Sequence, residues 1–349
     1  MRRREARWGR IATASGLLAG YLLDTALGDP RRLHPVAGFG KAAAALERRM
    51  YAPTRAAGAR YAALAIGVPV LAATALSVAT RRRPVARAAL VAVTTWTVLG
   101  GRSLHRQAGA LARSLQAGDL DAARRRLPNL AGRDPARLDE RELARATVES
   151  VAENTSDAVV APLFWGAVAG LPGLVGYRAV NTLDAMVGHR TPRYADFGTA
   201  AARADDVANL VPSRLTALAF VAGAPLVGGR RLRTAWIWFR DGNRHPSPNA
   251  GQCEAAMAGA LGVRLGGRNV YFGRAEERPT LGDGRPPEAI DAYRAIRLSA
   301  AAGAMAVSLA VLRALSGPWR RLVAGRRARR SGRERASRRG RRGASPMVG

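Results

Sequence analysis

The feature that most constrains this chain is a set of long apolar segments without charge. Residues 61–80 and 158–177 are each about twenty uncharged residues, rich in Ala, Leu, Val and Gly, which is the length that a helix needs to cross the hydrocarbon core of a bilayer. Shorter apolar runs occupy residues 11–27, 88–101, 215–229 and 298–312. Each short run could be a span or a buried core helix, and its length favours neither. We expect an all-α, multi-pass integral membrane helical bundle with about four to six spans.

Residues 158–177 differ from an ordinary span because they contain Pro162, Pro172 and several glycines. Proline removes a helical hydrogen bond, so we expect a kinked, broken or re-entrant helix. A complete span would put Glu153 and Asp184 on opposite sides of the bilayer, whereas a re-entrant segment would let them meet in one site. We favour the re-entrant arrangement, because irregular backbone at membrane depth is tolerated where it lines a cavity.

The charge of the chain is strongly positive and comes almost entirely from arginine. The formal net charge is +31, with 48% hydrophobic and 5% aromatic residues. The arginines flank the apolar runs and crowd both ends, which fits anionic lipid as a partner and argues against nucleic acid. Positive-inside counting places both termini and the turn at residues 81–83 in the cytoplasm of a cell-membrane protein. The single cysteine, Cys253, excludes an internal disulfide and a cysteine-rich metal site.

Composition divides the chain into three parts. Residues 1–10 form a basic N-terminus, residues 11–313 a single membrane-embedded domain, and residues 314–349 a basic tail that we expect to be disordered. Residues 11–27 resemble the apolar part of a signal peptide, but they contain Asp24 and no cleavage site follows, so we interpret them as a retained first helix. Residues 88–101 could pair with the preceding span as a helical hairpin.

Two groups of acidic residues lie beside the apolar segments. Glu149, Glu153 and Asp157 are four residues apart, so a helix would present them on one face. Like charges this close repel one another unless a cation or a basic group lies among them. The second group is Asp205, Asp206 and Asn209. Carboxylate and amide oxygens suit Mg²⁺, so we predict metal ligands in both groups: Glu149, Asp157, Asp205, Asp206 and Asn209. The alternatives are a solvated acidic edge for the first group, and helix caps or surface ion pairs for the second.

A polar stripe follows the second long apolar segment. Arg178, Asn181 and Asp184 are spaced by three, so they share one face of a mostly apolar helix. Asp184 is, with Glu153, a candidate catalytic carboxylate. Guanidinium groups suit phosphate or carboxylate ligands. We therefore predict substrate- or phosphate-binding roles for Asn181 and for the arginines near these clusters, which are Arg178, Arg203, Arg214 and Arg244.

A proline-rich loop with the sequence HPSPN occupies residues 245–249. His245, Ser247 and Asn249 alternate with prolines that stiffen the backbone, and a helix is expected to follow. The N-terminus of a helix is a suitable phosphate site, although a simple turn would explain the same residues. We expect Asn249→Ala to weaken the binding of a phosphate-bearing ligand with little effect on stability, because the loop is not expected in the core. Neither a Walker motif nor a dinucleotide-binding motif is present.

Four long motifs, in this order along the chain, resemble one protein family. They are GYLLDTALGDPRRLHPVAGFG, VESVAENTSDAVVAPLFWGAVAG, YRAVNTLDAMVGHRTPRYADFGTAAARADDVANLVPSRLTAL and RDGNRHPSPNAGQCEAAMAGALGVRLGGRNVYFG. Together they look like the cobalamin biosynthesis family CobD/CbiB, whose activity is named adenosylcobinamide-phosphate synthase. The resemblance runs from about residue 20 to about residue 312, so it leaves out the basic N-terminus and the basic tail.

The resemblance implies a membrane ligase of vitamin B12 assembly. Such an enzyme joins a corrinoid carboxylate of adenosylcobyric acid to the amine of (R)-1-amino-2-propanol, or of its O-phosphate, with ATP and Mg²⁺. On chemical grounds the acidic and Asn clusters would hold Mg²⁺, the arginines would neutralise phosphate, and His245 or Glu153 would act as the base. The alternative is a membrane transporter or binding protein for a corrinoid, because the same charged clusters could bind and pass a solute.

Overall fold

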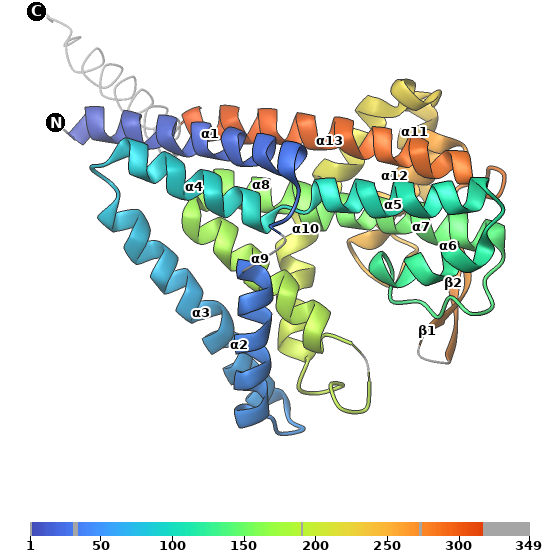
Figure 1. Ribbon diagram of the computed structural model, residues 1–349, viewed down its shortest axis with the longest axis horizontal. Helices are drawn as coiled ribbons and strands as arrows, with labels where there is room; N and C mark the ends of the chain where they lie inside the picture. Colours follow the sequence, from blue (N-terminus) through green and yellow to red (C-terminus); the bar gives the residue numbers. More distant parts are fainter. Residues whose placement is uncertain (1, 31–33, 190, 272–273, 317–349) are drawn as a thin grey trace, which may run out of the picture.

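A computed structural model describes residues 2–30, 34–189, 191–271 and 274–316 of the protein (Figure 1). Within these ranges the chain is an all-α membrane helical bundle with one small β-hairpin. The predicted disordered tail lies outside the described residues from position 317 onward, as does the Arg31–Leu33 part of the first family-like motif.

The elements follow one another with short connections. In chain order they are α1 (Arg2–Leu27), α2 (Pro35–Met50), α3 (Arg55–Ala79), α4 (Pro84–Val98), α5 (Gly101–Gln116), α6 (Leu120–Arg126), η1 (Leu127–Asn129), α7 (Glu140–Thr155), η2 (Ser156–Val160), α8 (Ala161–Ala169), α9 (Leu171–Val187), α10 (Thr199–Gly223), η3 (Ala224–Val227), α11 (Arg231–Asp241), α12 (Ala250–Leu261), β1 (Leu265–Tyr271), β2 (Arg274–Leu281) and α13 (Ala289–Ser316).

Four helical segments of the described chain are long and apolar enough to cross a membrane: Arg55–Ala79, Pro84–Gln116, Thr199–Val227 and Ala289–Ser316. The predicted run at 61–80 forms most of the first. Each of the short runs at 88–101, 215–229 and 298–312 belongs to a longer helical segment. Counting uncharged residues alone therefore underestimates the length of these helices. Residues 11–27 and 158–177 are helical but are not among the four.

Small residues bring α1 and α4 together along one side of the molecule (Figure 1). A Cβ added at Gly16 would collide with Val91, and one added at Gly20 would collide with Thr95, so these glycines permit the close approach of the two helices. The predicted hairpin of α3 with α4 is wrong. The two helices diverge from the turn at residues 81–83, and α3 packs against α9 instead (Figure 1).

The acidic residue of the first helix, Asp24, has a structural role. Asp24 is buried in α1, and its Oδ2 accepts a hydrogen bond of 3.3 Å from the backbone N–H of Arg102. Arg102 lies in the first turn of α5, where backbone N–H groups have no helical partner. Asp24 thus caps a neighbouring helix, and the basic residues at the N-terminus belong to the same continuous helix as Asp24.

The segment at 158–177 is broken, as its prolines and glycines predict. A π-helical turn, η2, joins α7 to α8, and the N–H of Ala161 bonds to the carbonyl of Ser156. Pro162 lacks an N–H, and the carbonyl of Ala158 accepts from Gly100 of the α4–α5 junction instead, at 3.1 Å. Gly170 then adopts φ 66°, which ends α8 and folds α9 back against it. The polar residues on both sides of the segment are thereby brought to the same region.

The β-hairpin is an addition to the predicted all-helical fold. β1 and β2 pair antiparallel with an irregularity between Leu265 and Gly267, where Gly266 and Gly267 have φ of 82° and 84°. Arg145 of α7 donates to the carbonyls of Gly266 and Arg268. These bonds anchor the base of the hairpin beside the polar end of α7.

Candidate active site

A large cavity lies between α5, α7, α9 and the loop before α12. Its volume is about 1160 Å³, and a second hollow of about 410 Å³ continues from it toward α10. The two parts share a set of polar side chains: Glu153, Asp157, Asp184, His245, Ser247 and Arg278. The break in residues 158–177 therefore places Glu153 and Asp184 in one site, as the re-entrant arrangement predicted.

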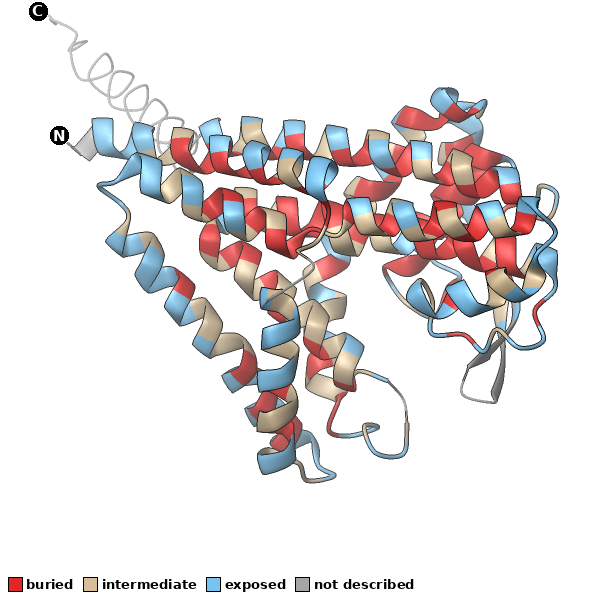
Figure 2. Cartoon of the chain, viewed as in Figure 1, coloured by how far each residue is buried: buried red, intermediate tan, exposed pale blue. Residues whose placement is uncertain are grey.

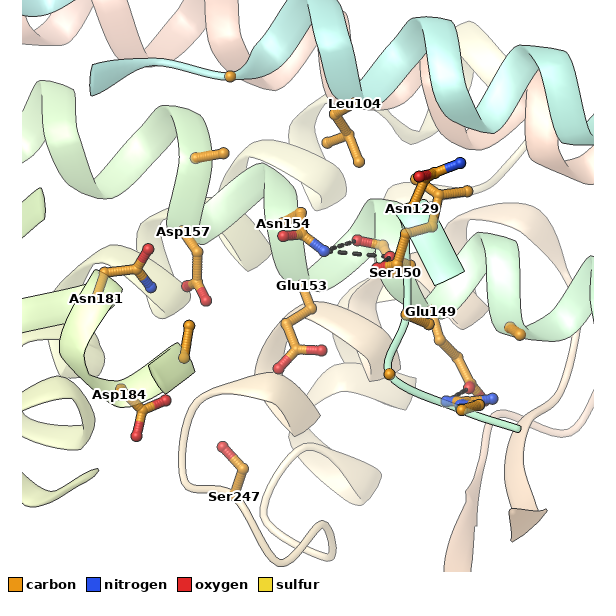
Figure 3. A pocket seen from close by; sticks show the side chains of 18 of the residues that line it. Leu104, Asn129, Glu149, Ser150, Glu153, Asn154, Asp157, Asn181, Asp184 and Ser247 are labelled. Atoms are coloured by element: carbon orange, nitrogen blue, oxygen red, sulfur yellow. Dashed lines mark hydrogen bonds and ion pairs between the residues drawn. The ribbon is translucent and has the colours of Figure 1, made fainter. Parts of the chain in front are cut away.

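Carboxylates form one wall of this cavity. Figure 3 shows Glu153 and Asp157 on the helix that runs through α7 and η2, with Asp184 approaching from α9 and Ser247 from the loop below. Among the described residues, the carboxylates of Glu153, Asp157, Asp184 and Asp206 have no hydrogen bond or ion pair. Carboxylates that face a cavity without a partner are suited to bind a cation or to accept a proton.

Burial and mutual repulsion make these acids weak. The pKa of Asp184 is raised to about 7, first by burial and then by the charges of Asp205, Asp206 and Glu153. Burial also raises the pKa of Glu153, although Arg278 opposes the shift, and it raises the pKa of Asp157 well above its usual value. The side chain of Glu153 is open to the cavity, but the surrounding protein still strips much of its hydration. Asp184 is therefore suited to exchange a proton near neutral pH, and burial favours the neutral forms of Glu153 and Asp157.

A hydrogen-bond network connects the polar stripe of α9 to the second acidic group on α10. Asn181 accepts from Arg178 at 3.4 Å and donates to Asp205 at 3.4 Å. The other oxygen of Asp205 accepts from Asn209 at 3.0 Å, and Tyr177 donates to Asn209 at 2.9 Å. Asp205 and Asn209 therefore hold α9 and α10 together through hydrogen bonds. The carboxylate of Asp206 remains available to bind a ligand.

The loop at 245–249 lines the larger cavity with His245 and Ser247, and Asn249 lines the smaller hollow while also holding the loop in place. Asn249 is buried; its Nδ2 donates to the carbonyl of Asp206 at 2.8 Å, and its Oδ1 accepts from Ser213 at 3.1 Å. Ser247 Oγ accepts from the N–H of Asn249 and of Ala250, which covers the start of α12. The premise that this loop lies outside the core is wrong for Asn249, because its buried side chain ties the loop to α10, so we now expect Asn249→Ala to lower stability.

Glu149 also differs from its predicted role as a metal ligand. Its side chain forms ion pairs with Arg133, and with Arg145 at 3.8 Å, and it accepts from the N–H of Gly266 at 2.7 Å. Glu149 is 2% exposed. Three donors satisfy this carboxylate, so its position in line with Glu153 and Asp157 does not make it a third free acid.

Of the four arginines that we predicted to bind substrate or phosphate, one lines the cavity. Arg178 is among the lining residues, whereas Arg203, Arg214 and Arg244 are not. Arg203 is exposed on α10, Arg214 donates to the carbonyl of Leu210, and Arg244 pairs with Asp241 at 3.3 Å. Proximity in the sequence to acidic residues therefore did not bring these three arginines into the cavity.

The carboxylates do not form a preformed multi-ligand metal site. No group of three or more His, Cys, Asp or Glu side chains that could hold a metal occurs in the described part of the chain. Mg²⁺ bound through substrate phosphates needs only one or two protein carboxylates. Asp157 and Asp206, which both line the smaller hollow without a partner, have the donor chemistry for that role.

Comparison with known proteins places the chain in a family. Residues 17–299 match the family described as CobD/Cbib protein. The chain belongs to the CobD/CbiB family. The cobalamin biosynthesis protein CobD of Mycobacterium tuberculosis is 52% identical over 300 residues, which is 86% of this chain and 95% of that protein. The protein of the same name from Geobacter metallireducens is 47% identical over 303 residues, which is 85% of this chain and 95% of that protein. No solved structure matches the chain.

As a CobD/CbiB protein the chain functions in cobalamin biosynthesis, and the cavity lies within the matched region. The fold adds lining residues to the site that sequence reasoning missed, among them Arg133, Ser150, Asn154 and Arg278. Ser150 and Asn154 were detectable, because they lie one turn apart on the face that carries Glu153. Arg133 and Arg278 were not, because a loop and a β-strand carry them into the cavity from distant parts of the sequence.

Proposed function

We propose that this CobD/CbiB protein is an amide-forming ligase of the cell membrane. It joins the side-chain carboxylate of adenosylcobyric acid to the amine of (R)-1-amino-2-propanol or its O-phosphate. ATP drives the reaction, and the product is adenosylcobinamide or its phosphate. Family membership supports the pathway, and the chemistry of the cavity supports the reaction class.

The observation that carries the proposal is one large cavity with acidic and basic walls. A volume of about 1160 Å³ exceeds the roughly 300–1,000 Å³ of ordinary small-molecule pockets, as a corrinoid would require. Arg133, Arg178 and Arg278 line the same cavity as Glu153 and Asp184. A ligase that uses an anionic acid, a nucleotide and a cationic amine needs both kinds of charge within one space.

The reaction proceeds in two balanced steps. The corrinoid carboxylate attacks the terminal phosphorus of ATP, which forms an acyl phosphate and releases ADP. The amine then attacks the acyl carbon, the amide bond forms, and inorganic phosphate leaves. The ammonium form of the amine must first lose a proton, and Asp184, with its pKa near 7, suits that task at neutral pH.

The chain's own residues would bind and orient the reactants. Arg178, fixed by Asn181, would neutralise phosphate or the corrinoid carboxylate, and the unpaired carboxylate of Glu153 would attract the ammonium group. Mg²⁺, when bound by Asp157, Asp206 and the phosphates, would offset the negative charge of the nucleotide. His245 and Ser247 line both parts of the cavity together with Glu153 and Asp157.

Purified full-length protein tests the proposal directly. The protein in detergent or nanodiscs is incubated with adenosylcobyric acid, aminopropanol or its phosphate, ATP and Mg²⁺, and the corrinoid is analysed by mass spectrometry. We expect an amide product whose formation matches ADP release. Transport of unmodified corrinoid into vesicles, with no product in any combination, would instead identify a transporter.

A further inference from the structure

One face of α11 is apolar, aromatic and exposed, which is unusual for a short helix of a folded domain. Leu232 is 88% exposed, Trp236 63% and Phe239 73%, and their spacing of four and three residues puts them on one side of the helix. The opposite side is fully packed: Thr234, Ile237 and Trp238 are buried, and Trp238 donates to Gln252 of α12 at 2.8 Å. The exposed face is therefore held rigidly outward by a well-packed inner face.

Arginines line a hollow at the N-terminal end of α11, beside the exposed apolar face. A depression of about 580 Å³ is lined by Pro225, Arg230, Arg231, Leu232 and Arg233. Arg233 pairs with Asp283 at 2.8 Å. Arg230 and Arg231 make no ion pair within the described residues, and the Nε of Arg231 donates to the carbonyl of Ala222 at 3.1 Å, which fixes its side chain. Two uncompensated guanidinium groups thus border the same depression as an exposed leucine.

The position of α11 in the fold indicates what covers it. The apolar segment Thr199–Val227 is one of the four candidate spans, and Leu226, near its end, is 56% exposed. The chain then turns at Gly228, with φ 77°, and α11 begins three residues later. α11 lies against α12 at the periphery of the molecule (Figure 1). Figure 2 shows exposed residues in this peripheral region. A helix that starts where a span ends lies at the boundary between acyl chains and headgroups.

We propose that α11 is an interfacial membrane anchor that binds anionic phospholipid. Leu232, Trp236 and Phe239 insert among the upper acyl chains, as the apolar face of an interfacial helix does, and tryptophan is favoured at this depth. Arg230 and Arg231 hold a lipid phosphate in the hollow, because basic pockets on the membrane surface bind anionic headgroups. This assignment is independent of the proposed ligase reaction, since none of these residues lines the catalytic cavity.

The first test measures the response of the purified full-length protein to lipid headgroups. Phosphatidylglycerol or phosphatidylcholine is added to the protein in detergent, and the melting temperature is recorded. We expect phosphatidylglycerol to raise the melting temperature more than phosphatidylcholine, and Arg230→Gln/Arg231→Gln to remove at least about half of this difference. Arg137→Gln/Arg141→Gln is the matched control, because it removes two exposed arginines outside both the hollow and the candidate spans. An equal loss in both double variants would overturn the headgroup site.

The second test does not depend on charge. Trp236→Phe preserves an apolar side chain and removes one fluorophore, so the difference between wild type and variant reports the environment of Trp236. In nanodiscs with lipids brominated near the headgroup, we expect quenching of the wild type to exceed quenching of the variant. Equal quenching of the two proteins would overturn the anchor. A halved mass of Trp236→Ala/Phe239→Ala in light scattering would also overturn it, because the face would then join two copies of the chain.

Discussion

Asp184 is the proposed base, and the same environment that suits it to that role makes its charged form unfavourable to the fold. Its pKa is raised to about 7 from the ordinary aspartate value of 3.8, so between these values the folded protein keeps a proton that the unfolded chain releases. Stability therefore falls as pH rises through this window, because the folded state binds more protons than the unfolded state. The same shift makes the group a proton acceptor near neutral pH.

Asp184→Asn should consequently abolish most activity and raise stability. If Asp184 is the base, wild-type turnover should increase with pH through about 7, and the variant should lose this limb of the profile together with most of its rate. The variant should melt at a higher temperature than the wild type at about pH 8, with the difference shrinking toward about pH 5. Turnover and melting temperature are measured on the same preparations. Near-normal turnover in Asp184→Asn would remove the residue from the reaction.

Asn249 contrasts with Asp184, because its hydrogen bonds indicate a mainly structural role. Asn249→Ala removes the hydrogen bonds to the carbonyl of Asp206 and from Ser213, and so removes the side-chain link between the loop and α10. We expect a loss of about 1–3 kcal/mol in the free energy of unfolding. Ser247→Ala, in the same loop but half-buried, should cost less. A stability unchanged by Asn249→Ala, with weakened ATP binding, would restore the original expectation of a purely ligand-binding role.

Glu149 illustrates why sequence spacing misassigned a residue. The i, i+4, i+8 pattern correctly placed Glu149, Glu153 and Asp157 along one helix, but it gave no information about Arg133, which arrives from the loop before α7. Glu149→Gln would leave Arg133, 7% exposed, without its carboxylate. We expect a loss of about 3–5 kcal/mol, as for one partner removed from a buried ion pair.

An exposed ion pair of the same kind supplies the control for Glu149→Gln. Asp121 and Arg124 form a surface pair on α6 at 3.1 Å, and Asp121→Asn should cost about 1 kcal/mol or less. Urea unfolding in detergent compares the two variants. Similar losses in both would show that the pair of Glu149 with Arg133 is not buried in the folded protein.

At the scale of elements, the break between α8 and α9 builds the site. Its presence was predictable from Pro162, Pro172 and the glycines, because their backbone effects are local. The π-helical turn was not predictable, because it depends on a distant residue. The backbone N–H of Gly100 donates to the Ala158 carbonyl from another part of the fold. The β-hairpin was also missed, because only its anchoring by Arg145 and Glu149 distinguishes its short polar strands from a loop.

Gly170→Ala tests the importance of this break. Gly170 has φ 66° and ψ −141°, a conformation essentially restricted to glycine, so a side chain there should cost about 1–3 kcal/mol. Because strain at this position would push α9 away from α8, the proposed ligase activity should fall with stability. Gly67→Ala is the control: Gly67 lies within helix α3, and a Cβ there would meet nothing within 4 Å. Gly67→Ala should be neutral or stabilising by up to about 1 kcal/mol, and an equal effect of both changes would contradict the argument.

At the scale of the whole molecule, the cavity connects segments that the sequence keeps far apart. The apolar runs predicted the class of fold, because hydrophobic length is a property of each segment alone. Which loops share a compartment was not predictable, since arginines lie on both sides of the intermediate spans. The fold resolves this for the site: Gly132 of the loop before α7 and Pro192 of the loop after α9 line the same cavity.

Gly132 and Pro192 should therefore be accessible from one side of the membrane. Cys253 is the only cysteine and is buried, so the native chain should react little with a membrane-impermeant maleimide. Gly132→Cys and Pro192→Cys place thiols at exposed positions, and Arg82→Cys marks the turn between α3 and α4. In sealed right-side-out and inverted vesicles, the thiols at residues 132 and 192 should be labelled from the same face of the membrane. If ATP enters the cavity from the cytoplasm, that face is the cytoplasmic one. Labelling of Gly132→Cys and Pro192→Cys from opposite faces would mean that the cavity crosses the bilayer, which is the arrangement of a transporter rather than of a ligase.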